Sequence, residues 1–298
     1  MPHSYSAPHV SQSPGAQLAI DCCGRGGSVA WCDGEDVLYV ETIAAGIRSA
    51  AGLTPAILQL QQQVRQAGQI APDAPSPRPN FISVTAGPGS FTGLRIGVTT
   101  AKSLAYAWGI PVVGVDTLHA MVQAAFRGAS NWDREVVAVL RGYRGLVYVF
   151  QGRASALIPD PRSDDSSHLN LARVMPVAAA CEIVANSPVD TVLVGDAFDH
   201  GPGSDGDAKP FVSPAGKIVI LDQHREHHSG EFLADSVGQL GHQMWSRGIG
   251  IEDATRLMPR YLRPSAAEEK AAERSGKRDA AAANMMNEKN QNESNPNA

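Results

Sequence analysis

The first hydrophobic runs of the chain are short and are separated by glycine and acidic residues. They are LAIDCC (18–23), GSVAWCDG (27–34) and VLYVETI (37–43). Short β-type runs with such turns between them predict an antiparallel meander at the start of a sheet. Adjacent Cys22 and Cys23 are then expected to alternate across a strand, one buried and one not.

Apolar residues next recur at helical spacing over 54–68, where Thr54 and Pro55 suit the first positions of a helix. FISVTA (81–86) is typical of a buried strand. It leads through a glycine-rich stretch into a second helical pattern over 90–108. After the strand-like IPVVGV (110–115), the predicted order is βββαβαβ.

The pattern then restarts. REVVAVL (134–140) and LVYVFQG (146–152) predict a hairpin, and VAAACEIVAN (177–186) predicts a helix. TVLVGDAF (191–198) predicts a strand, and 230–248 is an amphipathic helical pattern.

Two successive halves, each with an early hairpin and later α/β units, predict a two-lobed α/β fold. The best architectural match is the actin/Hsp70/sugar-kinase-like (ribonuclease-H-like) fold with a reduced second lobe. The expected division is a disordered arm (1–16), a first lobe that would carry an interface (17–116), a second lobe (117–250) with an insertion (199–217), a segment returning to the first lobe (251–264) and a disordered tail (265–298).

Composition narrows the class of protein. The chain has 298 residues, 43% of them hydrophobic, and a formal net charge of -5. A nucleic-acid-binding domain is expected to carry a basic excess, so RNA contact would need a local patch or another subunit. No apolar run reaches the roughly 20 residues of a membrane span, and the first residues lack the apolar core of a signal peptide. A cytoplasmic protein without membrane contact is expected.

The stretch AGPGSFTGLRIGVTTAKS (86–103) carries the first candidate chemistry. It lacks the lysine and Ser/Thr pair of a phosphate-binding Walker motif. Two interpretations remain open: an anion site made by the free N–H groups of the turn, or a capped turn with Ser90 or Thr92 as N-cap. The residues of the anion interpretation are Gly87, Gly89, Ser90 and Thr92.

A stripe of small residues runs along the helix that follows. Gly93, Gly97 and Ala101 are spaced by four residues. Glycine costs a helix about 1 kcal/mol relative to alanine, so the stripe indicates that another helix packs closely there.

Charged groups offer further candidates. Asp21 ends the first strand, where kinases and Hsp70-type ATPases place an aspartate near magnesium and phosphate. The alternative is that it caps the hairpin turn. HREHH (224–228) lacks the glutamate position of a zinc-protease motif. Arginines cluster twice, at Arg134, Arg141, Arg144 and Arg153 and at Arg256, Arg260 and Arg263. Either cluster would suit RNA phosphate or an acidic partner, or simply a solvated face. Arg141, Arg144, Arg260 and Arg263 are the candidate contacts.

The segment 86–121 resembles the signature segment of the bacterial TsaB (YeaZ) family, partner subunits in the synthesis of threonylcarbamoyladenosine on tRNA. Residues 18–34, 145–150 and 259–264 resemble that family's opening hairpin, second-lobe hairpin and C-terminal motif. The resemblance implies the two-lobed fold with a reduced second lobe.

The same segment is also similar to the catalytic sister family, TsaD, which transfers the threonylcarbamoyl group. The two histidines of that family's HxxxH metal pair fall on Thr117 and Met121 here. Neither residue suits an iron or zinc site. The resemblance therefore implies a scaffold subunit with no catalytic residue and no metal of its own.

The resemblance also implies partners. A TsaD-type catalytic subunit would bind the two first-lobe helices, with a TsaE-type ATPase joining the complex and tRNA reached indirectly. ATP or ADP and a metal would sit in the partner, none would bind this chain alone, and any shared nucleotide would meet the glycine turn and Asp21. A homodimer is expected when the partner is absent. The expected interface residues are Gly93, Gly97, Thr100, Ala101, Leu104, Ile57, Gln61 and Val64. The alternatives are an autonomous ATPase or carbamoyl transferase of the same superfold and, more weakly, a metallopeptidase-like protein.

Overall fold

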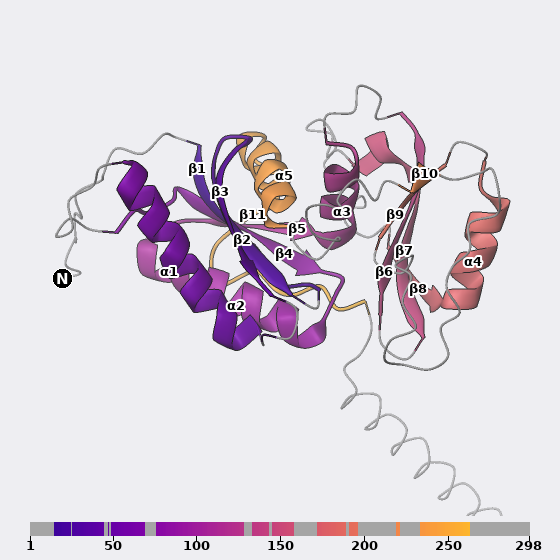
Figure 1. Ribbon diagram of the computed structural model, residues 1–298, viewed down its shortest axis with the longest axis horizontal. Helices are drawn as coiled ribbons and strands as arrows, with labels where there is room; N and C mark the ends of the chain where they lie inside the picture. The colour runs from indigo at the N-terminus through magenta and orange to yellow at the C-terminus, as the bar shows by residue number, and fades with distance from the viewer. Residues whose placement is uncertain are drawn as a thin grey trace, which may run out of the picture. The chain divides into compact units, whose positions relative to one another are not determined.

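A computed structural model gives the arrangement of the chain (Figure 1). It describes residues 15–24, 26–44, 47, 49–68, 76–127, 133–142, 145–157, 172–188, 191–195, 219–220 and 233–262. The chain divides into two compact units, residues 1–260 and residues 261–298. All the helices and strands named below belong to the first unit.

The first sheet has the strand order β11-β5-β4-β1-β2-β3. Strand β1 runs antiparallel to β2 and parallel to β4, and β4 runs parallel to β5. The meander and the following α/β order are those that the hydrophobic pattern predicts. The strands are β1 (Ala16–Asp21), β2 (Gly27–Asp33), β3 (Asp36–Ile43), β4 (Phe81–Gly87), β5 (Val112–Asp116) and β11 (Ile251–Glu252).

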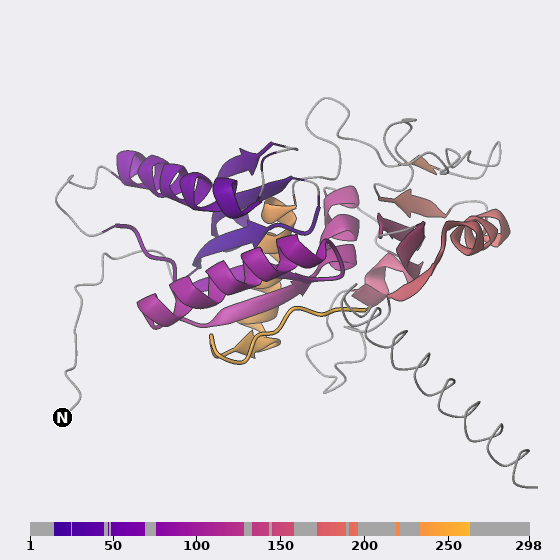
Figure 2. The same cartoon turned by 90° about the horizontal axis from the view of Figure 1, so that it is seen from below.

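Helices cover both faces of this sheet. Strand β1 alternates, so that Leu18 and Ile20 pack in one apolar cluster with α1 (Ser49–Ala67) and α2 (Phe91–Trp108). Ala19 packs in the other cluster with α5 (Ala234–Ser246), and Figures 1 and 2 show α5 across the sheet from α1 and α2.

The position of α5 differs from the expected division, which placed 230–248 in the second lobe. Helix α5 contacts β1, β2, β4 and β5 of the first sheet. The physical reason is packing: Gly241 allows the helix to approach Ser83, and Gly238 faces Cys32. Strand β11 follows and pairs antiparallel with β5 of the same sheet.

Helix α1 also differs from its prediction. It begins at Ser49, five positions before the predicted N-cap Thr54, and Pro55 lies inside it. Gly52 in the added turn packs against the side chain of Ile43. A tertiary contact therefore extends this helix beyond the residue that local preference would choose.

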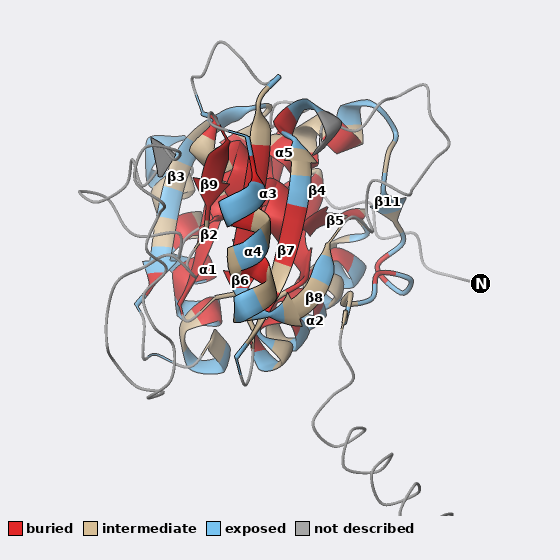
Figure 3. Cartoon of the chain, turned by 90° about the vertical axis from the view of Figure 1, so that its right-hand side faces the viewer, coloured by how far each residue is buried: buried red, intermediate tan, exposed pale blue. Residues whose placement is uncertain are grey.

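The second sheet has the order β10-β9-β6-β7-β8. The predicted hairpin is confirmed, with β6 antiparallel to β7, and the helix predicted over 177–186 is α4. Figure 3 shows buried strands behind the partly exposed α4. The remaining elements are α3 (Thr117–Ala125), β6 (Glu135–Arg141), β7 (Leu146–Arg153), a 3-10 turn (Ala154–Leu157), β8 (Arg173–Pro176), α4 (Val177–Asn186), β9 (Val192–Val194) and β10 (Val219–Ile220).

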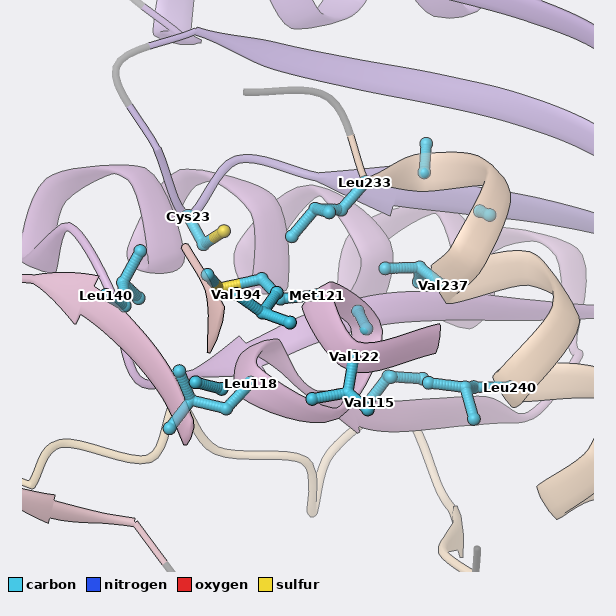
Figure 4. Close-up of a cluster of buried hydrophobic side chains, with 14 of the residues drawn as sticks. Cys23, Val115, Leu118, Met121, Val122, Leu140, Val194, Leu233, Val237 and Leu240 are labelled. Atoms are coloured by element: carbon cyan, nitrogen blue, oxygen red, sulfur yellow. The ribbon is translucent and has the colours of Figure 1, made fainter. Parts of the chain in front are cut away.

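One apolar cluster contains residues of both sheets. Cys23, Met121, Leu140, Val194 and Leu233 belong to it and converge in Figure 4. Of the helices in the described residues, none has the length and apolar character that crossing a membrane requires. The insertion expected at 199–217 and the two predicted disordered ends, apart from Gly15 and Ala16, lie outside the described residues.

Candidate functional site

The glycine turn joins β4 to α2 and ends in a helix cap. The Ser90 hydroxyl accepts a hydrogen bond from the Gly93 N–H at 3.2 Å, and Ser90 has non-helical backbone angles. This is the geometry of an N-cap. The capped-turn interpretation is therefore confirmed with Ser90 as the cap, and Ser90 and Thr92 both lie on the surface.

Three glycines of the turn have neighbours from their own chain. A Cβ at Gly87 would overlap the carbonyl oxygen of Arg260, and Gly87 has φ 122°. A Cβ at Gly89 would lie 2.8 Å from the carbonyl oxygen of Cys23, and one at Gly93 would overlap that of Cys22. Glycine is thus required here because the backbone passes close by.

The segment after β1 also accepts a hydrogen bond from the turn. The Ser90 N–H donates to the Cys23 carbonyl at 2.8 Å. The turn therefore uses this N–H within its own chain, and a bound phosphate would have to compete with the carbonyl for it.

Cys22 and Cys23 are both buried, which corrects the expectation that one would be exposed. They lie beyond the last residue of β1, so the alternation of a strand no longer applies to them. Burial raises the pKa of both thiols, and nearby Asp21 raises each further. Both thiols are therefore protonated at neutral pH and behave as small apolar groups.

Asp21 is fully buried at the carboxyl end of β1. One oxygen, Oδ1, accepts from the Cys23 N–H at 3.1 Å and from the Thr85 hydroxyl at 3.0 Å. The other, Oδ2, accepts from the Leu233 N–H at 3.3 Å. Desolvation raises the pKa of this carboxyl, and hydrogen bonds from the side chain and backbone of Cys23, from Thr85 and from Leu233 lower it in part.

The bond to Cys23 matches the turn-capping interpretation of Asp21. The bond to Leu233 was not foreseen, because no local sequence signal relates residues so far apart. Sequence reasoning also missed Asp116 at the end of β5, although an aspartate directly before a helical run is an N-cap signal. Its Oδ1 accepts from the N–H groups of Leu118 (2.8 Å) and His119 (3.2 Å).

The small-residue stripe faces inward. Gly93, Gly97 and Ala101 are all buried, and a Cβ at Gly97 would lie 3.3 Å from that of Cys22. The close approach that this stripe permits is therefore made within the protein, by Cys22 in the segment after β1 and, at Gly97, also by Val84 of β4. This corrects the expectation that the stripe packs against another subunit.

The other expected interface residues differ in exposure. Ile57 is buried in the core under α1, whereas Gln61, Val64, Thr100 and Leu104 are partly exposed. Two apolar side chains on the same helices are more exposed than any of these. Leu58 on α1 is 60% exposed and Tyr106 on α2 is 78% exposed.

The C-terminal strap, residues 253–260, runs from β11 to the glycine turn. Lys102 of α2 donates to the carbonyls of Thr255 (3.2 Å) and Leu257 (2.9 Å). The Arg260 N–H donates to the Ala86 carbonyl at 2.6 Å, and the Arg260 guanidinium lies 3.7 Å from the Asp116 carboxylate. Of the four candidate contact arginines, Arg260 thus lies beside a carboxylate of its own chain.

The remaining candidates are partly described. Arg141 is exposed at the end of β6, whereas Arg144, Arg263 and the HREHH segment lie outside the described residues. Thr117 and Met121, at the histidine positions of the TsaD family, are buried in α3. Within the described part of the chain, no group of three or more His, Cys, Asp or Glu is arranged to hold a metal.

Comparison with known proteins gives a consistent set of similarities. The family model "TsaD: tRNA N6-adenosine threonylcarbamoyltransferase" matches residues 73–178. TsaB of Escherichia coli K12 is 42% identical over 69 residues, which cover 23% of this chain and 29% of that protein. TsaB of Bacillus subtilis is 36% identical over 84 residues, covering 26% and 35%. The chain thus spans about a third of the length of the TsaB relatives it matches.

The solved structure of YeaZ from Pseudomonas aeruginosa is similar over 84% of this chain and 100% of that chain. Its TM-score is 0.55 at 21% sequence identity. These matches confirm the resemblance to TsaB (YeaZ) and its relation to TsaD, and the YeaZ structure confirms the two-lobed fold class.

Proposed function

We propose that this chain takes part in the biosynthesis of threonylcarbamoyladenosine on tRNA as a partner subunit without catalytic chemistry of its own. One observation carries the proposal. The segment that is 42% identical to E. coli TsaB belongs to a chain with the two-lobed fold of YeaZ. Thr117 and Met121 at the positions of the TsaD histidines support the non-catalytic role, because neither side chain is a good ligand for iron or zinc.

The proposed partner is a TsaD-type subunit, and the proposed contact surface is the outer face of α1 and α2. With Gly93, Gly97 and Ala101 facing inward, the surface is formed by residues that remain accessible on the two helices. They are Leu58, Gln61, Val64, Thr100, Leu104 and Tyr106. Apolar and aromatic side chains of this kind are typical anchors of a helix-helix interface.

The experiment is calorimetric titration of a TsaD-type subunit with the wild-type chain and with Leu58→Asp and Tyr106→Ala. Both substitutions lie on exposed positions, so the fold should survive them. We expect at least a tenfold loss of affinity for Leu58→Asp. Ile251→Asp is the matched control, because Ile251 is 42% exposed on β11, a strand outside both helices. Equal affinity for all variants would refute this surface.

Further elements of the proposal concern the assembled complex. A TsaE-type ATPase joins it, tRNA is contacted through the complex, and ATP or ADP with a metal belongs to the partner. Without the partner, the same apolar surface closes a homodimer, as self-complementary patches commonly do. Light scattering of the purified chain, with and without the TsaD-type subunit, tests this exchange.

The rival function is an autonomous ATPase or carbamoyl transferase that uses Asp21 and the glycine turn. The burial of Asp21 and the contact of the turn with Cys22 and Cys23 argue against it. The purified chain with magnesium and ATP should show no turnover, and activity should require the TsaD-type subunit. Turnover by the chain alone would favour the rival.

A further inference from the structure

The carboxyl ends of β1, β4 and β5 meet at one edge of the first sheet, which we call the carboxyl edge. Open α/β sheets bind their ligands at such an edge, and the two-lobed nucleotide-binding proteins place an aspartate there, near magnesium. In this chain the edge is formed by Asp21, Gly87 and Asp116. The fold thus implies a magnesium-nucleotide site, and the residues present can be tested against it.

The Asp21 carboxylate does not fit that role. Its side chain is completely buried, and both oxygens accept hydrogen bonds from within the chain. A magnesium ion requires accessible oxygen ligands and retains several waters. A hydrated ion cannot reach a carboxylate that is buried in this way.

The glycine turn does not fit either. The space that its glycines leave beside the backbone holds the carbonyls of Cys22, Cys23 and Arg260 rather than an opening. A phosphate needs that space and several free N–H groups together. The Ser90 N–H is already bonded to Cys23.

Apolar side chains also surround the carboxyl edge next to Asp21. Cys23 belongs to the same buried cluster as Met121, Leu140, Val194 and Leu233, and Figure 4 shows these side chains in one region of the core. An apolar enclosure disfavours the charge of a triphosphate and its metal.

The start of helix α5 is hydrogen-bonded to Asp21, the carboxylate that would otherwise face magnesium. Its N-cap residue, Leu233, makes no side-chain cap of its own. The Leu233 N–H instead donates to Asp21, and the Ala234 N–H donates to the Ser28 hydroxyl at 3.0 Å. Two residues of the opening hairpin thus satisfy N–H groups that the start of a helix leaves free. A carboxylate at this end also complements the helix dipole.

We infer that the nucleotide site of this superfold has become a structural joint in this chain, in which Asp21 and Ser28 cap α5 and position it on the first sheet. Asp21 is a positioning residue in this joint. The inference goes beyond the proposed function and does not depend on it, since an enzyme or a scaffold could carry the same joint.

Amide hydrogen exchange in the full chain tests the joint at single residues. In Asp21→Asn, one acceptor is lost and an amide donor faces the Leu233 N–H, so exchange at Leu233 should accelerate at least tenfold. In Ser28→Ala, the acceleration should fall on Ala234 instead. Asp133→Asn is the matched control, because that aspartate is 65% exposed and should change neither amide.

A second measurement concerns nucleotide. Titration of the wild-type chain with magnesium-ATP should give no binding heat and no protection of the Leu233 amide. Binding that Asp21→Asn abolishes, with exchange at Leu233 unchanged, would overturn the inference. If Asp21→Asn does not fold, Ser28→Ala and the wild-type titration test the inference instead. In Ser28→Ala, exchange that accelerates equally at all core amides would contradict a local cap. Loss of binding to a TsaD-type subunit would bear on the proposed function alone.

Discussion

Asp21 accepts a hydrogen bond from the backbone N–H of Leu233, a residue 212 positions later in the chain. The contact joins the end of β1 to the start of α5, which covers a face of the same sheet. The first lobe is therefore complete only when residues from both ends of the sequence have met.

The first prediction concerns pH. Burial raises the pKa of Asp21 above its ordinary value of 3.8, so the folded protein holds this proton more tightly than the unfolded chain does. The stabilisation from this group is fully present below the ordinary pKa and is lost as pH rises through the folded-state pKa. The free energy of unfolding of the wild type, minus that of Asp21→Asn, should therefore fall with rising pH. Urea unfolding of both proteins from about pH 4 to about pH 8 measures it. A difference that is flat or rises with pH would contradict the raised pKa.

The second prediction concerns Gly93. A methyl group at this position would overlap the Cys22 carbonyl, so Gly93→Ala should destabilise the protein by about 1–3 kcal/mol despite the better helix propensity of alanine. Ser103→Ala, at an exposed position of the same helix, is the control and should change stability little. Thermal unfolding compares them. A stabilised Gly93→Ala protein would show that the stripe is open rather than packed.

The third prediction uses a pair in contact. A methyl group at Gly238 of α5 would lie 2.5 Å from the Cys32 sulfur. Gly238→Ala should therefore cost about 1–3 kcal/mol, and Cys32→Ala in the same protein should recover part of it by removing the sulfur. A double-mutant cycle by denaturant unfolding gives the coupling. Additive effects would mean that α5 does not press on β2 at this point.

The fourth prediction concerns the four thiols. Cys22, Cys23 and Cys32 are buried, and burial raises the pKa of the Cys32 thiol to about 12. Cys181 on α4 is partly exposed. A thiol-specific disulfide reagent at mildly alkaline pH should label one cysteine of the native chain quickly and the other three only on unfolding. Cys181→Ser should remove the fast phase; its persistence would place a reactive thiol in the core.

Local patterns predicted much of the fold. The alternation in the opening strands and the helical spacing of α2 and α4 reflect contacts of each element with a sheet or a core nearby, and such periodicity is visible in the sequence. The order of strands and helices followed from these patterns. The start of α1 did not, because its first turn is held by the contact of Gly52 with Ile43.

The site was harder to predict because its residues contact residues that are distant in the sequence. Small residues at Gly93 and Gly97 indicated a close approach, but the identity of the approaching group, the backbone and side chain of Cys22, lies about 70 positions earlier in the chain. The same holds for Gly87 and the Arg260 carbonyl. A stripe of small residues predicts contact, whereas only the fold decides whether the contact is internal.

The covering of the first sheet by α5 has a consequence for the nascent chain. Synthesis delivers β1 to β5 early, but the helix that shields one face of their sheet, α5, and the strand that pairs with β5, β11, follow more than 100 residues later. Until then the apolar face of that sheet lacks its native cover. The second lobe is thus synthesised before the first can finish folding. A chaperone that binds exposed apolar strands would bind this chain in that interval.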